Sequence, residues 1–183
     1  MNEKNIKGTS KFLSFVLRHS PETIELELDE NGWAKVEELI IQCNKHNKYD
    51  SLLDFDLLNL VVETNDKKRF AFNEDKSKIR ASQGHSITVE LNLKEVEPLA
   101  YLYHGTVADS IESIKEKGLQ KMSRQHVHLS KDKETAIKVG GRRGKPIILI
   151  VDAKSMQATG FKFYLSENEV WLTEEVPAKY IQF

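Results

Sequence analysis

Apolar and polar residues near the amino terminus repeat with the period of an amphipathic helix. The apolar stripe of this helix consists of Phe12, Leu13, Val16 and Leu17. Thr9 or Ser10 can cap the helix at its start, and Pro21 cannot continue it because proline lacks the amide hydrogen. The pattern therefore predicts a helix that runs into Arg18 and His19 and stops before Pro21.

The rest of the first half predicts two more helices and then a hairpin. Apolar residues have helical spacing at Val36, Leu39 and Ile40, and again at Phe55, Leu58 and Val62. The second of these runs follows Asp54, a residue type that caps helices. Before both runs, residues 24–28 alternate like a strand and then reach a turn at Asn31 and Gly32. Two short extended runs surround a polar turn in RFAFNEDKSKIRA, which is typical of a β-hairpin.

From about residue 96 the pattern changes to strands with short helices between them. Strands are predicted at LAYLYHGT, HVHLS, IILIVDA, FKFYL and EVWLT, with IILIVDA buried on both faces because it is apolar throughout. One predicted helix, SIESIKEK, is capped by Asp109 and ended by Gly118, and KETAIKV forms another. We therefore expect an α+β protein with two lobes, residues 1–95 and residues 96–183.

The composition narrows the possible functions. The 183 residues are 39% apolar and 30% charged, as in a globular protein, and the formal net charge is −1. This charge disfavours a protein that coats nucleic acid nonspecifically, but it leaves room for one local cationic pocket. Cys43 is the only cysteine, which excludes a disulfide framework. We find no signal peptide and no membrane-spanning run, so we expect a cytoplasmic protein with no membrane partner.

Three arginines stand where local structure does not require them. Arg18 follows an apolar helix, Arg69 enters a strand, and Arg124 lies in a loop before HVHLS. Each has an ordinary structural explanation, since a cation at a helix carboxyl end is stabilised by the helix dipole and the other two suit a solvated surface. Taken one at a time, these residues do not establish a site.

The histidines are more informative. YHGT places His104, Gly105 and Thr106 at the end of a strand, where a glycine lets a ligand approach the backbone closely. His126 and His128 are two residues apart on a predicted strand and so share a face. A zinc site would need four ligands at recognisable spacing, and neither cysteines nor close acidic residues complete one. We therefore expect no metal.

Eight motifs in order carry a resemblance that spans nearly the whole chain. They are SKFLSFVLRHSPE, LDENGWAKVEELI, DKKRFAF, IRASQGHS, YHGT, HVHLS, GKPIILIVDA and NEVWLTEEVP. Together they resemble the RNA 2′-phosphotransferase family, also called KptA. The resemblance implies an amino-terminal winged-helix lobe that contributes to RNA binding and catalysis, and a carboxyl-terminal lobe of the ADP-ribosyltransferase type that binds NAD⁺.

The reaction implied by the resemblance transfers an internal 2′-phosphate of RNA to NAD⁺, which serves as a co-substrate. The RNA phosphate attacks the anomeric carbon of the nicotinamide ribose and expels nicotinamide, giving a 2′-phospho-ADP-ribosylated RNA intermediate. The neighbouring ribose 2″-hydroxyl then attacks phosphorus. The products are 2′-hydroxyl RNA, ADP-ribose 1″,2″-cyclic phosphate and nicotinamide.

The family's essential residues match Arg18, His19, Arg69 and Arg124 in this sequence. The resemblance implies that these four side chains surround a single phosphate pocket. Its NAD⁺ signature, two histidines and a hydrophobic residue, matches His104, His128 and Val170, and we expect the neighbouring Gly105, Thr106, Leu129 and Ser130 to contribute to cofactor binding. His128 fits this pattern better than His126 because it directly precedes Leu129 and Ser130.

Other residues and other functions stay open at this level. Arg80, Gln83 and His85 suit either RNA contact or a lobe interface, and the loop residues Arg142, Arg143 and Lys145 suit either a pyrophosphate or solvent. One rival function is a nucleic-acid-binding winged helix, which the acidic and apolar run DFDLLNLVVETN disfavours. Another is an ADP-ribosyltransferase that modifies protein or the terminal phosphates of nucleic acid. We expect a monomer.

Overall fold

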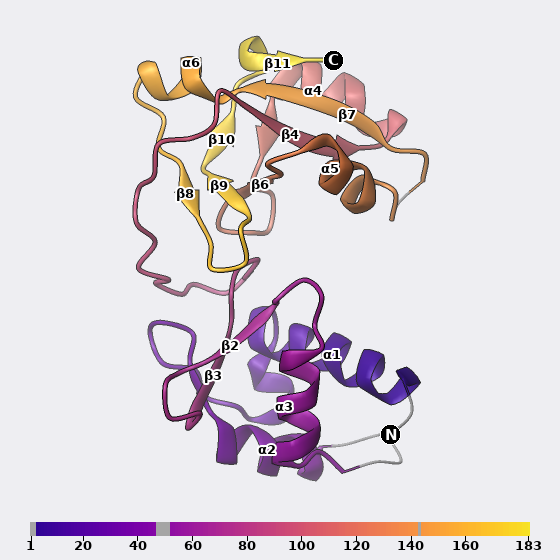
Figure 1. Ribbon diagram of the computed structural model, residues 1–183, viewed down its shortest axis with the longest axis vertical. Helices are drawn as coiled ribbons and strands as arrows, with labels where there is room; N and C mark the ends of the chain where they lie inside the picture. The colour runs from indigo at the N-terminus through magenta and orange to yellow at the C-terminus, as the bar shows by residue number, and fades with distance from the viewer. Residues whose placement is uncertain (1–2, 47–51, 143) are drawn as a thin grey trace. The chain divides into compact units, whose positions relative to one another are not determined.

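The computed structural model describes residues 3–46, 52–142 and 144–183 and contains both helices and sheets. The chain divides into two compact units, Met1–Asn92 and Leu93–Phe183, each with its own hydrophobic core (Figure 1). The sequence pattern placed the change in character near residue 95. In the part of the chain that is described, no helix is long and apolar enough to cross a membrane.

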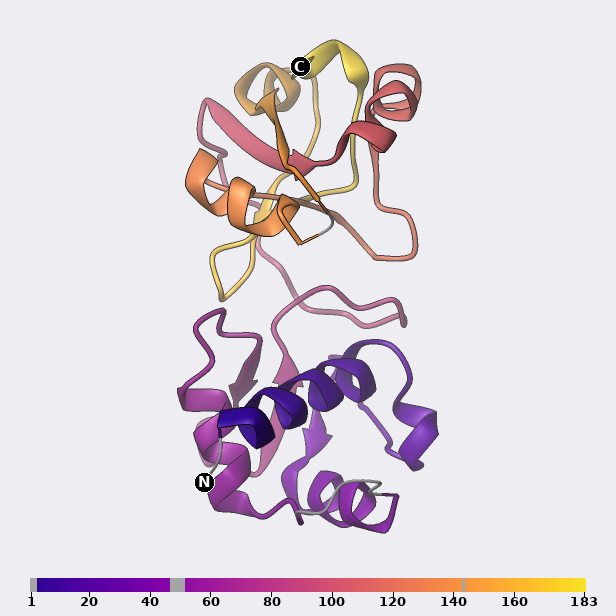
Figure 2. The same cartoon turned by 90° about the vertical axis from the view of Figure 1, so that its right-hand side faces the viewer.

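Unit 1 consists of helices around a small antiparallel sheet, and α1 is seen lengthwise in Figure 2. Its elements are α1 (Glu3–Arg18), η1 (Pro21–Ile24), β1 (Ala34–Lys35), α2 (Val36–Lys45), α3 (Phe55–Glu63), β2 (Phe70–Phe72) and β3 (Lys78–Ala81). The sheet order is β1-β3-β2, and the hairpin pairs Phe70 with Ala81. The predicted helices over 36–45 and 55–63 and the predicted hairpin are thereby confirmed.

Local signals explain where some of these elements begin. Asp54 caps α3 as predicted, since its carboxylate accepts a hydrogen bond from the Leu57 amide at 2.8 Å. The predicted cap of the first helix was wrong, because α1 begins at Glu3 and so contains both Thr9 and Ser10. The predicted strand over residues 24–28 was also wrong, because the 3₁₀ helix η1 extends to Ile24 and no strand follows until β1.

The core of unit 1 joins all of its main elements. It is built from side chains that are almost fully buried: Leu13, Val16 and Leu17 of α1, Ile24, Leu39 of α2, Leu57, Leu58 and Val61 of α3, and Phe70 and Ile79 of the hairpin. Because the apolar stripe of α1 turns inward, the opposite side of this helix faces solvent. The polar residues of that side become available to a ligand.

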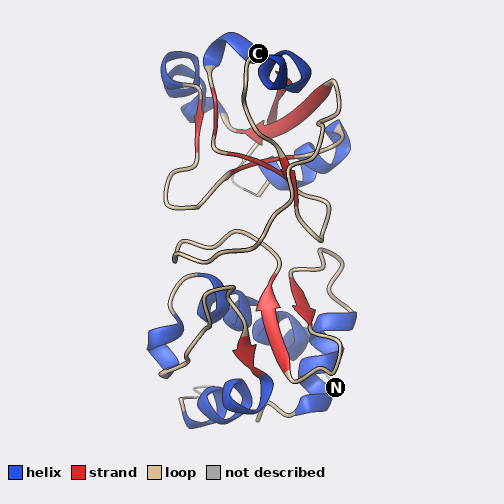
Figure 3. Ribbon diagram, turned by 90° about the vertical axis from the view of Figure 1, so that its left-hand side faces the viewer, coloured by secondary structure: helices blue, strands red, loops and turns tan. Residues whose placement is uncertain are grey.

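Unit 2 is richer in strands, which Figure 3 shows in red. Its elements are β4 (Tyr101–Thr106), η2 (Ala108–Ser110), α4 (Ile111–Lys117), β5 (Leu119–Gln120), β6 (Val127–Leu129), α5 (Lys133–Gly140), β7 (Ile147–Asp152), α6 (Ala153–Ala158), β8 (Tyr164–Leu165), β9 (Trp171–Thr173), β10 (Glu175–Val176), η3 (Ala178–Tyr180) and β11 (Ile181–Gln182). The predicted strands and helices are each represented, most of them shortened.

The strands of unit 2 form small antiparallel sheets, two of which are joined by a backbone bridge. The sheet orders are β11-β7-β4, β6-β9-β8 and β10-β5. Tyr103 of β4 and Ser130, just after β6, exchange two backbone hydrogen bonds of 2.9 and 2.7 Å. This bridge joins the first two sheets and brings β4 beside β6.

His104, Gly105 and Thr106 lie at the end of β4, as predicted, and each pairs with a residue of β7. Two other predictions for unit 2 need correction. Asp109 does not cap a helix, since it lies inside η2 and Ser110 precedes α4; Gly118 does end α4, with φ of 73°. The strand β7 is fully buried at alternate residues only, and the side chains between them are half-buried.

Candidate active site

Three of the four predicted catalytic residues lie in unit 1, where they line one groove of about 910 Å³. The groove is formed by one side of α1 and by the end of α3 with the turn that follows it. Its lining residues are Ile6, Lys7, Ser10, Lys11, Ser14, Phe15, Arg18, His19, Val61, Thr64, Asn65, Asp66, Lys67 and Arg69. The structure thus brings Arg18, His19 and Arg69 together although 51 positions separate Arg18 from Arg69.

Arg18 and Arg69 are held by backbone and side-chain contacts. Arg18 is the last residue of α1, and its guanidinium donates to the Arg69 carbonyl oxygen at 3.5 Å. The Arg69 guanidinium donates to the side-chain oxygen of Asn65 at 3.1 Å. Both arginines are half-buried, so their side chains have less conformational entropy to lose when they bind an anion.

Asn65 organises the turn before Arg69, and the sequence analysis missed it. It is 9% exposed, and its side-chain oxygen also accepts from the backbone amides of Lys67 and Arg69 at 3.2 and 3.4 Å. Its amide nitrogen donates to the Ser10 hydroxyl of α1 at 3.0 Å. An asparagine directly after a predicted helix is a typical turn residue, and that signal was available in the sequence.

His19 follows α1 and is fixed by the loop after β3. Its Nδ1 lies 2.9 Å from the Ser86 hydroxyl, and the Ser86 amide donates to the Arg18 carbonyl at 2.9 Å. The loop therefore satisfies one carbonyl at the end of α1 and orients the imidazole at the same time. Ser86 is a second positioning residue that only the folded chain reveals.

His85 is buried beneath this corner of unit 1. It is 1% exposed, and neither ring nitrogen has a hydrogen-bond partner among the described residues. Burial, together with the nearby charges of Arg18, His19 and Arg80, lowers the pKa of His85 to about 4. His85 is therefore a neutral packing residue at physiological pH. Arg80 itself lies over the Trp33 ring, 4.5 Å from its centroid.

In unit 2, the fourth predicted catalytic residue is linked to the two predicted NAD⁺-binding histidines. Arg124 Nη1 lies 3.1 Å from His128 Nδ1, and His104 Nδ1 lies 3.0 Å from the His128 carbonyl oxygen. A guanidinium can only donate, so His128 accepts at Nδ1 and carries its proton on Nε2. A carbonyl can only accept, so His104 carries its proton on Nδ1 and presents Nε2 as an acceptor.

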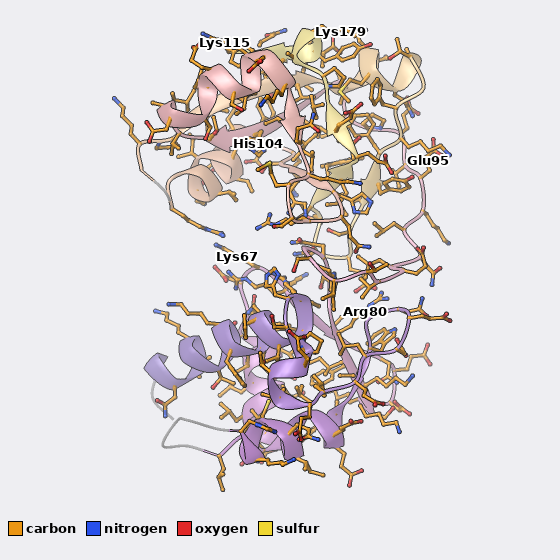
Figure 4. The ribbon with its side chains drawn as sticks, turned by 180° about the vertical axis from the view of Figure 1, so that it is seen from behind. Lys67, Arg80, Glu95, His104, Lys115 and Lys179 are labelled. Carbon is orange, nitrogen blue, oxygen red and sulfur yellow. The ribbon has the colours of Figure 1, made fainter. Side chains whose placement is uncertain are left out.

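The charge state of His104 follows from its surroundings. Burial lowers its pKa, the hydrogen bond to the His128 carbonyl acts in the opposite direction, and the Arg124 charge lowers it again. His104 is accordingly neutral at physiological pH. Figure 4 labels this histidine in unit 2, and labels Lys67 and Arg80 in unit 1.

Val170 lies in the tight turn between β8 and β9. The Ser166 amide donates to the Val170 carbonyl and the Val170 amide to the Ser166 hydroxyl, both at 3.0 Å. Glu169 of this turn forms an ion pair of 2.7 Å with Lys131, which ties the chain after β6 to the turn. Since β6 pairs with β9, His128 lies on the strand next to the one that Val170 precedes.

The residues around these histidines include two whose observed role differs from the predicted one. A Cβ on Gly105 would lie 2.0 Å from the Ala136 carbonyl oxygen, so the space beside this glycine is filled by helix α5 and not by a ligand. Leu129 is 2% exposed and belongs to the core of unit 2, so its side chain is not available to a cofactor. Thr106 is buried at 9% exposure, and Ser130 holds the bridge to β4.

His126 is placed differently from His128. It lies in the bend before β6 and not on the strand, and its ring packs edge-on against Tyr164 at 5.8 Å. The expectation that both histidines share one strand face is therefore corrected. Within residues 3–46, 52–142 and 144–183, no group of three or more His, Cys, Asp or Glu side chains is arranged to hold a metal ion. Arg143 lies outside the described residues.

The predicted residues thus fall into two local clusters, one in each unit. Arg18, His19 and Arg69 form the cluster of unit 1, and His104, Arg124 and His128 form that of unit 2. The first offers two guanidinium groups and an imidazole, which suit a phosphate. The second offers a neutral acceptor and a neutral donor, and Val170 lies in the turn before β9, the strand that pairs with β6. That all four catalytic residues surround one pocket stays a prediction.

Comparison with known proteins gives one consistent answer. The sequence matches the family model described as RNA 2′-phosphotransferase, Tpt1 / KptA family, over residues 3–175. A Flavobacterium johnsoniae protein named probable RNA 2′-phosphotransferase is 69% identical over 183 residues, which is 100% of this chain and 99% of that protein. A protein of the same name from Fusobacterium nucleatum is 57% identical over 174 residues, or 94% of this chain and 96% of that protein.

Proposed function

Because the chain belongs to the RNA 2′-phosphotransferase Tpt1 / KptA family, we propose that it removes an internal 2′-phosphate from RNA by transferring it to NAD⁺. The observation that carries this proposal is the groove of unit 1, in which Arg18, His19 and Arg69 meet. We propose further that unit 1 is a winged helix and that unit 2 has an ADP-ribosyltransferase-like fold. The α1–α3 helices with the β2–β3 hairpin, and the strand-rich second unit, support this assignment.

Capture of the phosphate is the role of the arginines. A phosphomonoester carries nearly two negative charges near neutral pH, so it is already nucleophilic and needs no general base. Arg18 and Arg69 present planar donors that match phosphate oxygens and stay charged at every physiological pH. Arg124 adds a third guanidinium from unit 2 in this proposal. The same donors stabilise charge on the phosphoryl oxygens when the bond to RNA breaks.

His19 contributes hydrogen bonding on the same side. The Ser86 hydroxyl holds its Nδ1, which leaves Nε2 to reach a phosphate oxygen or to move a proton. Because the ring is anchored through Nδ1, its orientation does not depend on the substrate. A preorganised imidazole of this kind loses less entropy when the substrate binds.

The histidines of unit 2 suit the sugar and amide groups of NAD⁺. The Nε2 atom of His104 can accept a hydrogen bond from a ribose hydroxyl, and the Nε2 proton of His128 can be donated to a ribose or amide oxygen. Val170 would line the same site with an aliphatic surface. When bound, NAD⁺ supplies the ribose that accepts the phosphate and a nicotinamide that leaves. The residues of the chain bind and orient the reactants.

The proposal is tested with an oligoribonucleotide that carries one internal 2′-phosphate. The protein is incubated with this RNA in the presence and absence of NAD⁺. The RNA, nicotinamide and nucleotide products are then separated, identified by mass spectrometry and quantified. We expect 2′-hydroxyl RNA, nicotinamide and ADP-ribose 1″,2″-cyclic phosphate in equal amounts, and only with NAD⁺. Arg69→Gln should slow the reaction at least about 30-fold, and Lys35→Gln, an exposed change outside the groove, should leave the rate unchanged.

Two other outcomes would contradict the proposal. Release of inorganic phosphate without NAD⁺ would identify an ordinary phosphatase. ADP-ribose that stays attached to RNA, to a terminal phosphate or to protein, with no dephosphorylated product, would identify an ADP-ribosyltransferase instead. Both outcomes are distinguished by the masses of the products.

A further inference from the structure

The groove of unit 1 extends well beyond the residues that would hold the 2′-phosphate. Along α1 it is lined by Lys7, Lys11, Phe15 and Arg18, which follow one another at intervals of three to four residues and so lie on one side of the helix. With a rise of 1.5 Å per residue, Lys7 lies about 16 Å from Arg18 along the helix axis. One phosphate does not account for a surface of that length.

The charge of the groove is strongly one-sided. Five lysine and arginine side chains line it, and Asp66 is the only carboxylate among its described lining residues. The lysines are Lys7, Lys11 and Lys67, and all three are exposed. The whole chain carries a formal net charge of −1, so this concentration of cations is local. Such a surface is complementary to a ligand with several negative charges in a row.

An aromatic side chain lies within these cations. Phe15 is 43% exposed, although it lies one turn before Arg18 on a helix whose other large apolar residues are mostly buried. Ile6, which is only partly buried, adds apolar surface to the same groove. Cations that follow a sugar-phosphate backbone, combined with an exposed aromatic ring for a base, are the usual elements of single-strand binding.

We propose that this side of α1 binds the RNA strand on one side of the 2′-phosphorylated nucleotide, with Lys7 and Lys11 on backbone phosphates and Phe15 stacked on an unpaired base. The inference rests on the proposed function, since it takes the bound phosphate at Arg18 and Arg69 as the fixed point of the strand. It predicts a preference for substrates with several single-stranded nucleotides beside that phosphate. The substrate class is therefore an RNA with an unpaired segment at the phosphorylated position.

The first test measures RNA binding and does not depend on catalytic turnover. A fluorescently labelled, single-stranded 12-nucleotide RNA without a 2′-phosphate is titrated with full-length protein at several salt concentrations. A Lys7→Gln, Lys11→Gln double variant should bind more weakly and should lower the slope of log affinity against log salt by about 1.4, or 0.7 for each lost phosphate contact. The matched Lys35→Gln variant, which removes an exposed lysine elsewhere in unit 1, should keep the wild-type slope.

Phe15→Leu separates stacking from charge. Leucine keeps an apolar side chain on the helix but has no aromatic face, so affinity for the same RNA should fall about 5- to 50-fold with the salt slope unchanged. If the double lysine variant and the leucine variant both bind the RNA as the wild type does, the proposal is wrong. A fall in affinity that is equal for single- and double-stranded RNA would contradict the stacked base.

The second test uses turnover. The ratio of kcat/KM for a 2′-phosphorylated 12-mer to that for a 2′-phosphorylated dinucleotide should fall at least about fivefold in the double lysine variant, mainly through KM of the longer substrate. An unchanged ratio would contradict the proposed strand site even if the enzyme is active. If the wild type removes no 2′-phosphate at all, the proposed function fails, and the binding titrations still decide the strand site by themselves.

Discussion

Arg69 shows how a single cation becomes part of a site. Its guanidinium is held by Asn65, and its carbonyl accepts from the Arg18 guanidinium and from the Ser82 amide, the latter at 2.9 Å. Ser82 also donates its hydroxyl to the Lys68 carbonyl at 2.9 Å, and Lys68 has a positive φ of 41°. These hydrogen bonds fix the turn before β2 and therefore fix the orientation of the Arg69 side chain.

Gly105 provides a prediction about packing. Gly105→Ala should lower the free energy of unfolding by about 1–3 kcal/mol, because the new methyl group would overlap the backbone of α5 and neither element can move freely. Urea denaturation followed by Trp171 fluorescence in a Trp33→Phe background reports on unit 2. Gly8→Ala is the control in unit 1, followed by Trp33 fluorescence in a Trp171→Phe background: nothing lies within 4 Å of its Cβ position inside α1, so this change should stabilise by about 0.5–1 kcal/mol.

His85 provides a prediction about pH. Its pKa is about 4 in the folded protein and about 6.5 when unfolded, so between these values the unfolded chain binds a proton that the folded one does not. Stability therefore falls as pH is lowered from 6.5 to 4, by up to about 3 kcal/mol from this residue. His85→Leu should remove that part of the pH dependence. Parallel stability curves of both proteins across this range would show the prediction to be wrong.

Val170 provides a prediction about charge in the proposed active site. Val170→Glu would add a carboxylate where a phosphate dianion has to enter, and the two would repel each other in a poorly hydrated site. Removal of the 2′-phosphate should therefore slow by at least about tenfold relative to Val170→Gln, which has nearly the same size and no charge. Added salt should reduce the difference. Equal rates for the two variants would contradict a role for charge at this position.

At the scale of the elements, an acidic residue before a helix marks the helix start correctly when its carboxylate accepts a hydrogen bond from an amide of the first turn. Asp54 was predicted to cap a helix and does so, and Asp132 caps α5 by accepting from the Thr135 amide at 2.7 Å. Asp109 has the same chemistry but lies within η2, where its side chain is exposed and caps nothing. An acidic residue before a predicted helix therefore does not establish a cap by itself. The hydrogen bond from its carboxylate to a backbone amide does.

Asp109 and Asp132 of unit 2 give a matched pair for a test. Asp132→Ala should lower the free energy of unfolding by about 1 kcal/mol, because the first turn of α5 would lose its bonded amide. Asp109→Ala should change it by less than about 0.5 kcal/mol, as is usual for surface substitutions. Both are measured by urea denaturation of the full-length protein. A larger loss from Asp109 than from Asp132 would reverse the assignment of the cap.

At the scale of the whole molecule, the chain has two cores and two clusters of candidate catalytic residues. Every buried residue of the first core lies between Leu13 and Ala81, and every one of the second between Leu102 and Ile181. The arginines that we propose to bind the phosphate are likewise divided, with Arg18 and Arg69 in unit 1 and Arg124 in unit 2. A reaction that needs all of them requires both units.

This division gives a prediction about coupling. Arg69→Ala and Arg124→Ala should each reduce kcat/KM by about 2–4 kcal/mol of transition-state stabilisation, or roughly 30- to 1,000-fold. If both act on one phosphate, the double variant should lose clearly less than the sum of the two single losses. The pair Arg69→Ala and Lys35→Gln provides the control and should be additive. Additive losses for the two arginines would mean that they act on separate groups.

Much of this protein is determined by the sequence itself. Helical spacing located α2 and α3, a polar turn between extended runs located the β2–β3 hairpin, and the eight motifs led to a family that the comparisons confirmed. These helices, the hairpin and the motifs depend on residues that are close together in the chain, so their spacing and residue types can be read directly from the sequence. The identity of Arg18, His19, Arg69 and Arg124 as candidates came from the motifs in the same way.

Only the tertiary structure decided which residues hold those candidates in place. Asn65, Ser86 and the space that Gly105 leaves for α5 depend on contacts between segments far apart in sequence, which no local pattern encodes. The spacing of the apolar stripe already placed Phe15 outside the core side of α1. The groove itself could not be read in the sequence, because its other wall consists of residues 61–69, which are brought beside α1 only by folding.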